Sequence, residues 1–188
     1  TPSGNMHGMP IAMACGFDNF ECKVNDPRGE TLDYWEQIKN VGIPGPKINT
    51  EDIVYIAVRD IEKPENYLLN KYNINFIEVE DVRKSGSEWI AQKALQMLDH
   101  CDLIYVSFDV DSIDSRFSTG TGTPVPNGLT IEEAKVLNEE LCKDPKVCAW
   151  EIVEVNPTLD TENRMAESAF EIMEASAKSI VGRPVMVG

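Results

Sequence analysis

The chain has 188 residues, of which 42% are hydrophobic and 26% charged, a composition typical of a water-soluble globular protein. Its net charge of −15 argues against nucleic acids and anionic membrane surfaces as partners. No apolar run approaches the roughly 18 residues that a membrane-spanning helix needs, so the sequence predicts no membrane span.

Alternating strand and helix patterns begin near residue 50. Residues 14–50 are rich in Gly and Pro and predict an irregular segment with one helix near 34–39. After it we expect a strand over 53–58, a helix over 65–72, a strand over 74–77 and a helix over 89–98. A strand that ends at Asp109, a helix over 130–141, a strand over 147–155 and a helix to about residue 180 follow. This alternation predicts a mainly parallel sheet with helices on both faces, a three-layer α/β/α sandwich. Without repeats or a linker, residues 1–188 are interpreted as a single domain.

Two aspartates follow the most apolar of these predicted strands. Residues 103–106 are an unbroken apolar run, which is typical of a strand covered on both faces. Side chains alternate along a strand, so we expect Asp109 and Asp111 to point to the same side. Ligands of open α/β sheets bind at the carboxyl ends of the strands, and two carboxylates there need a cation or a hydrogen-bond network. The alternative is a structural pair of helix caps or salt-bridged aspartates.

Two further features bear on function and compartment. Residues 112–129 form a long predicted loop after the aspartate pair, and loops of that length in compact domains are usually functional. The five cysteines are an odd number without a C-x-x-C pair, so we expect reduced thiols in a cytoplasmic protein rather than a disulfide framework or zinc site.

Four short motifs occur in a characteristic order. They are S-G-N-M-H-G-M-P at 3–10, S-F-D-V-D at 107–111, T-G-T-P at 121–124 and E-V-N-P at 154–157. With these motifs the chain resembles the ureohydrolase family over its whole length, and within that family the second half of the arginases. The resemblance implies an arginase-like fold whose N-terminal part is absent from this chain.

The implied activity is metal-dependent hydrolysis of the guanidinium group of L-arginine to L-ornithine and urea. A hydroxide that bridges two Mn²⁺ ions attacks the guanidinium carbon, and carboxylate and imidazole ligands suit these ions. Asp109 and Asp111 match the family's second pair of metal-binding aspartates. The remaining ligands, in G-G-D-H-S and D-A-H-x-D segments, are expected upstream of Thr1, so this segment alone is expected to be inactive. The family also implies a homo-oligomer, either a trimer or a multiple of trimers.

The resemblance also assigns catalytic roles to two residues. Glu154 matches the carboxylate that faces the substrate guanidinium, a pairing that suits the planar two-pronged geometry of both groups. The structural alternative is a surface glutamate at a strand end. His7 matches the histidine that returns a proton to the leaving amine, as a group titrating near pH 7 can do.

Further residues match substrate-binding positions. Ser3 and Asn5 correspond to the segment that holds the α-carboxylate, and Thr123 to a threonine near the guanidinium. Glu62 and Glu65 lie where the family carries acids for the α-amino group, although arginases usually show R-D-x-D there. For these two glutamates the alternative is a solvated run of charges.

Other functions remain open. An agmatinase or another guanidino-acid ureohydrolase would share the metal site but would not need Ser3 and Asn5, because agmatine has no α-carboxylate. A noncatalytic relative that binds an amino acid, or an inactive fragment, would lack the upstream metal ligands. The residues that precede Thr1 would distinguish these alternatives from an enzyme.

Overall fold

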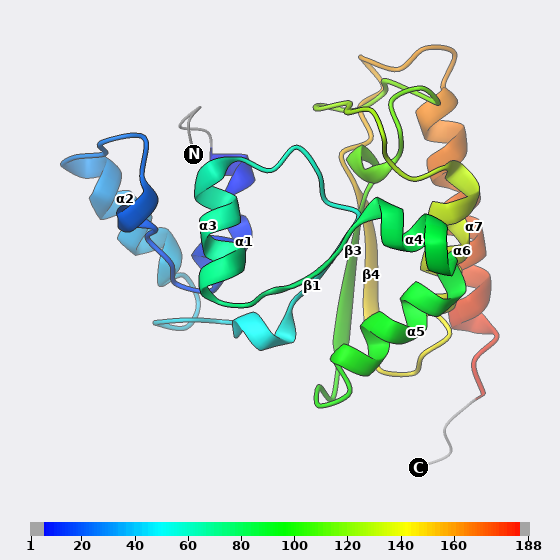
Figure 1. Cartoon of the computed structure of the whole chain (residues 1–188), viewed down its shortest axis with the longest axis horizontal. Coiled ribbons are helices and arrows are strands. Elements are labelled where there is room, and N and C mark those ends of the chain that lie inside the picture. Colours follow the sequence, from blue (N-terminus) through cyan, green and yellow to red (C-terminus); the bar gives the residue numbers. More distant parts are fainter. Residues whose placement is uncertain (1–5, 185–188) are drawn as a thin grey trace. The chain divides into compact units, whose positions relative to one another are not determined.

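The computed structural model describes residues 6–184, apart from the side chain of His7, and divides into two compact units. The first unit comprises Thr1–Ile53 and Ile61–Asn75, and the second comprises Val54–Asp60 and Phe76–Gly188. Figure 1 labels the principal helices and strands of both units.

The first unit is built from short helices. These are the 3₁₀ turns η1 (Met6–Gly8), η2 (Phe20–Cys22) and η3 (Thr50–Asp52) and the α-helices α1 (Pro10–Ala14), α2 (Glu30–Lys39) and α3 (Lys63–Lys71). The helices predicted near 34–39 and 65–72 are thus confirmed as α2 and α3. Phe17 stacks on Tyr72 with ring centroids 4.1 Å apart, and the buried Lys39 ammonium lies 2.5 Å from the Asp18 carboxylate. These contacts tie together segments that are distant in the sequence.

The second unit contains the strands, in the pairs β1–β2 and β3–β4. Its elements are β1 (Val54–Ile56), β2 (Asn75–Ile77, which begins at the unit boundary), α4 (Val79–Ser85), α5 (Ser87–Met97), β3 (Ile104–Asp109), η4 (Val110–Ser112), α6 (Ile131–Leu141), β4 (Val147–Val153) and α7 (Arg164–Val181). Each strand and helix predicted after residue 76 is confirmed, with ends that differ by a few residues. Helix α4 was not predicted, because its seven residues are too few to establish a helical period.

The core of the second unit lies between the β3–β4 pair and the helices α4 to α7, which Figure 1 shows on one side of these strands. Phe108 of β3 belongs to this core, and both Phe108 and Ile104 are 6% exposed, whereas Tyr105 between them is 60% exposed. The prediction that this strand is covered on both faces is therefore wrong within this unit. Strand alternation sends every second side chain to the face opposite the helices.

The pairing of β3 with β4 places two strand ends side by side. The two strands are parallel, and their register pairs Phe108 with Ile152 and Asp109 with Val153. Because parallel strands end at the same edge of a sheet, Glu154, the residue after β4, emerges beside Asp109, the last residue of β3. This register is the feature of the fold that assembles the candidate site.

Capping fixes the helices that follow each strand. Thr130 and Glu133 form a capping box at the start of α6, with hydrogen bonds of 3.0 and 2.7 Å. The carboxylate of Asp160 accepts hydrogen bonds from the main-chain nitrogens of Met165 and Ala166 in the first turn of α7. Among the described residues, no helix has the length and apolar character needed to cross a membrane.

Candidate functional site

Asp109 and Asp111 lie together at the carboxyl end of β3, but not by strand alternation. Strand β3 ends at Asp109, and Asp111 belongs to the 3₁₀ turn η4. The main-chain nitrogen of Asp111 donates a hydrogen bond of 2.8 Å to Asp109 Oδ1, so Asp109 caps the turn that carries Asp111. The predicted strand end at Asp109 is confirmed, but the alternation of a strand does not extend to Asp111, because the chain turns at Val110.

Two threonines of the loop between η4 and α6 hold the Asp111 carboxylate. Thr121 Oγ1 donates a hydrogen bond to Asp111 Oδ1, and Thr123 Oγ1 donates one to Asp111 Oδ2. Thr121 Oγ1 also lies 2.9 Å from the main-chain oxygen of Glu154, and this side chain is only 1% exposed. The sequence reasoning named Thr123 and missed Thr121, although its place two residues earlier in the same T-G-T-P motif was a usable signal.

Glu154 reaches the same place from β4. Its backbone has φ = +66°, in the left-handed region that non-glycine residues seldom adopt. Backbone strain of this kind costs on the order of 1 kcal/mol and is concentrated at functional sites. The neighbouring Gly122 leaves space for the carboxylate, since a methyl group there would lie 3.3 Å from Glu154 Oε2.

The site has an excess of negative charge. Burial raises the pKa of the Asp109 carboxyl to about 6, and the nearby Asp111 and Glu154 carboxylates raise it further, while the hydrogen bond from Asp111 and the Arg59 guanidinium oppose this shift. A carboxyl group held in this state gains from any bound cation that supplies the missing countercharge. The arrangement therefore favours a metal ion, a cationic substrate or both.

The donor set suits a hard divalent ion such as Mn²⁺, because Asp109 and Asp111 offer carboxylate oxygens at one point. Among residues 6–184, however, the carboxylates at the ends of β3 and β4 do not bring three ligand atoms within 4.8 Å of one another. The residues present thus fit a manganese site in chemistry, and they would need further ligands to complete it.

The remaining predicted site residues lie elsewhere in the chain. Ser3 and Asn5 fall outside the described residues, and the structure gives only the backbone of His7, in η1. The exposed Glu62 and Glu65 form a capping box at the start of α3, in which Glu62 N donates a 2.8 Å hydrogen bond to Glu65 Oε2. Their substrate-binding roles stay predictions.

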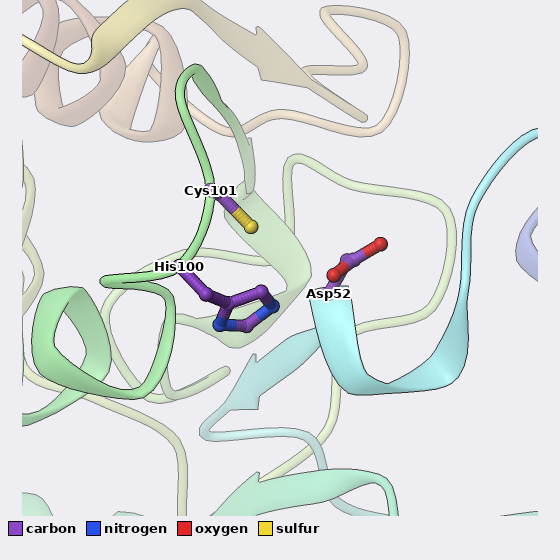
Figure 2. Close-up of side chains that lie close together, drawn as sticks. All are labelled: Asp52, His100 and Cys101. Atoms are coloured by element: carbon purple, nitrogen blue, oxygen red, sulfur yellow. The ribbon is translucent and has the colours of Figure 1, made fainter.

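A second histidine occupies a different position. His100 is exposed and precedes Cys101 in the turn that follows α5 (Figure 2). The third labelled side chain, Asp52, is the last residue of η3 in the first unit. All five cysteines are free thiols in the described part of the chain, as predicted.

Comparison with known proteins agrees with these observations. The sequence model of the Arginase family matches residues 1–177. An arginase from Brevibacillus brevis is 31% identical over 93% of this chain and 54% of its own length, and the human mitochondrial arginase-2 is 31% identical over 92% and 46%. The chain spans about half the length of the curated relatives it matches.

Solved structures show the same relationship in three dimensions. The crystal structure of the Bacillus subtilis arginase superposes with a TM-score of 0.80 at 28% identity, over 99% of this chain and 58% of that protein. An Entamoeba histolytica arginase, solved in complex with L-ornithine, gives a TM-score of 0.77 at 30% identity over 97% of this chain and 54% of its own. The α/β fold with parallel strands is therefore an arginase-like fold.

Proposed function

The chain belongs to the arginase family, and on that basis we propose that the full-length protein hydrolyses the guanidinium group of L-arginine to L-ornithine and urea. The observation that carries the proposal is the convergence of Asp109, Asp111 and Glu154 at the adjoining ends of β3 and β4. A cluster of carboxylates suits both a divalent metal and a cationic substrate. The E. histolytica relative, which binds L-ornithine, supports the proposed product.

Glu154 is proposed to bind the substrate guanidinium. A carboxylate and a guanidinium pair through two parallel hydrogen bonds, which fix both the distance and the plane of the substrate. The left-handed backbone of Glu154 turns the chain sharply after β4, and Gly122 leaves the carboxylate unobstructed on one side. Holding the guanidinium carbon in one orientation lowers the barrier by positioning, since the reacting groups no longer need to find each other.

Asp109 and Asp111 are proposed to hold manganese together with ligands from outside residues 1–188. When bound, such a metal lowers the pKa of water towards neutrality and so supplies a nucleophile. Thr121 and Thr123 fix both oxygens of Asp111 and so determine how that carboxylate is presented. His7 is proposed to deliver the proton that the leaving amine requires.

The test is urea release by the full-length protein after loading with Mn²⁺. L-Arginine, agmatine and guanidinobutyrate are supplied in parallel at equal concentration. We expect the highest kcat/KM with L-arginine. Faster turnover of agmatine would assign the protein to the agmatinases instead, and absence of urea with all three substrates would favour a noncatalytic relative.

Residues 1–188 alone are expected to release no urea from L-arginine, even with excess Mn²⁺. Asp109 and Asp111 offer too few ligands, and an incomplete ligand set does not hold two ions within a few ångströms of each other. The segment is expressed by itself, and urea is measured beside the full-length protein as the positive control. Robust turnover by the segment would show that the ligands expected upstream are dispensable.

A further inference from the structure

Arg59, in the segment after β1, binds the long loop that carries the site. Among the described residues, its guanidinium donates hydrogen bonds to main-chain carbonyl oxygens alone: Nε to Pro126 (3.0 Å), Nη1 to Ser112 (3.2 Å) and Nη2 to Asp111 (2.9 Å), Ile113 (3.2 Å) and Val125 (2.6 Å). These acceptors lie 52 to 67 residues away in the sequence. A single side chain thus joins the start of the loop, at residues 111–113, to its end, at 125–126.

The two ends of the loop also meet each other around this guanidinium, and we call this place the loop neck (residues 111–114 and 125–129). Asp114 N donates to the Leu129 oxygen (2.9 Å) and Leu129 N to the Ser112 oxygen (2.8 Å). A methyl group on Gly128 would lie 2.5 Å from the Ser112 oxygen and 2.6 Å from Arg59 Nη2. The neck is packed so closely that it accepts no side chain at position 128.

The loop neck determines where Asp111, Thr121 and Thr123 lie. Asp111 belongs to the neck itself, and its main-chain oxygen accepts from Arg59 while its carboxylate accepts from Thr121 and Thr123. Both threonines lie on the loop that the neck closes. A shift of the neck would therefore move Asp111 relative to Asp109 and would also move the hydroxyl groups that orient its carboxylate.

Arg59 is also a countercharge for the acidic residues around it. Burial lowers the pKa of its guanidinium, and the attraction of Asp114, Asp111 and Asp109 opposes this shift. Within residues 6–184 its hydrogen bonds go to main-chain oxygens and not to carboxylates, so Arg59 does not occupy the Asp109 and Asp111 carboxylate oxygens. A guanidinium offers five donors in a rigid plane, which an ammonium does not.

We propose that Arg59 is a positioning residue, whose bonds to the loop neck hold Asp111, Thr121 and Thr123 in the arrangement that binds the metal. The part of the inference that concerns metal binding rests on the proposed function. The part that concerns the loop neck rests on the hydrogen bonds alone.

Arg83 provides a matched control. It is an arginine of α4 that donates one hydrogen bond to the same loop, from Nη2 to the Gly128 oxygen at 2.8 Å. Its replacement removes a positive charge near the loop but leaves all the carbonyl bonds of Arg59 in place. A difference between the Arg59 and Arg83 variants in exchange or Mn²⁺ affinity therefore reports the carbonyl bonds of Arg59, and not its charge or the general stability of the unit.

The experiment compares Arg59→Ala, Arg59→Lys and Arg83→Ala with wild type in the full-length protein. Amide hydrogen exchange is followed at Asp114, Ser115 and Leu129 in the neck and along α6, and Mn²⁺ affinity is measured by titration calorimetry. For Arg59→Ala we expect at least about tenfold faster exchange in the neck, unchanged exchange in α6 and Mn²⁺ affinity lowered about 10- to 100-fold. Arg59→Lys is expected to give values between those of wild type and Arg59→Ala, since an ammonium satisfies fewer carbonyls. Arg83→Ala is expected to keep the wild-type Mn²⁺ affinity and the wild-type exchange at Asp114 and Ser115, and to differ only at Leu129, whose peptide group carries the oxygen that Arg83 binds.

Three results would overturn the proposal. The first is amide exchange in the neck of Arg59→Ala that equals that of wild type. The second is an increase in exchange at Asp114 and Ser115, or a loss of Mn²⁺ affinity, that is as large in Arg83→Ala as in Arg59→Ala. The third is faster exchange in α6 as well as in the neck of both Arg59 variants, which would show a general loss of stability. If wild type binds no Mn²⁺, the proposed function fails, while the exchange measurement still decides whether Arg59 holds the loop neck.

Discussion

Replacing Asp109 or Asp111 by asparagine is expected to lower the Mn²⁺ affinity of the full-length protein by at least about 100-fold. Residues that only support a metal ligand already contribute about 10- to 100-fold, and an amide in place of a ligating carboxylate removes a charge as well as an oxygen. Urea release should be lost in both variants. Manganese content is measured by elemental analysis, and full occupancy in either variant would show that the metal site is misplaced.

The two variants should differ in the stability of the metal-free protein. The Asp111 carboxylate accepts hydrogen bonds from Thr121 and Thr123. In Asp111→Asn one of these two hydroxyl groups would face an NH₂ group, which cannot accept its hydrogen, so we expect the fold to lose about 1–2 kcal/mol of stability. The pKa of Asp109 is raised to about 6, so its ionised form opposes folding near neutral pH. A shift of that size corresponds to about 3 kcal/mol, and solvent screening of this partly exposed group leaves an expected gain of about 1 kcal/mol for Asp109→Asn.

The pH dependence of this gain follows from the direction of the shift. A carboxyl whose pKa is higher in the folded state than in the unfolded state stabilises the fold at low pH, and this contribution is lost as the pH rises from about 4 through about 6. The melting temperature of Asp109→Asn minus that of wild type should therefore be larger at pH 7.5 than at pH 4.5, with both proteins in a chelator. An equal difference at the two pH values would contradict the raised pKa.

Replacing Glu154 by glutamine is expected to reduce kcat/KM for L-arginine by at least about tenfold while the bound Mn²⁺ is retained. The amide keeps the shape of the side chain but not its charge, and a hydrogen bond to a charged group contributes about 1.5–3 kcal/mol. The melting temperature should change little, because the Glu154 carboxylate makes no hydrogen bond within the described part of the chain, and the contact with Thr121 is made by the Glu154 main-chain oxygen.

Glu151 offers a control on the same strand. It lies three residues before Glu154 on β4, and its Oε1 accepts a 2.8 Å hydrogen bond from Ser107 of β3. Glu151→Gln removes the same charge from the same strand and is expected to leave kcat/KM unchanged. Equal kinetic losses in Glu151→Gln and Glu154→Gln would indicate a general electrostatic effect instead of a bond to the substrate.

The site residues of the second unit share a dependence on long-range contacts. Asp109 and Glu154 meet through the register of β3 and β4, Thr121 joins Asp111 to the Glu154 backbone, and Arg59 joins both ends of the loop. A substitution that shifts any one of these contacts changes the geometry of the others. We therefore expect variants of this site to be non-additive when they are combined.

Sequence alone determined the features that depend on local patterns. The capping box of Thr130 and Glu133, the period of the helices α5 to α7 and the apolar runs of β3 and β4 are properties of neighbouring residues, and they predicted elements that the structure confirms. The apolar run before Asp109 also predicted that two carboxylates follow the end of a strand, and the structure confirms this for Asp109 and Asp111.

Tertiary structure decided how those residues meet. The left-handed backbone of Glu154, the contact of the Thr121 hydroxyl with the Glu154 main-chain oxygen and the carbonyl contacts of Arg59 have no local signal. Each depends on partners tens of residues away, such as the 52 residues between Arg59 and Asp111. A local pattern fixes the type of element and its buried face, whereas the register between strands and the closure of a long loop are set by packing and hydrogen bonds that exist only once the chain has folded.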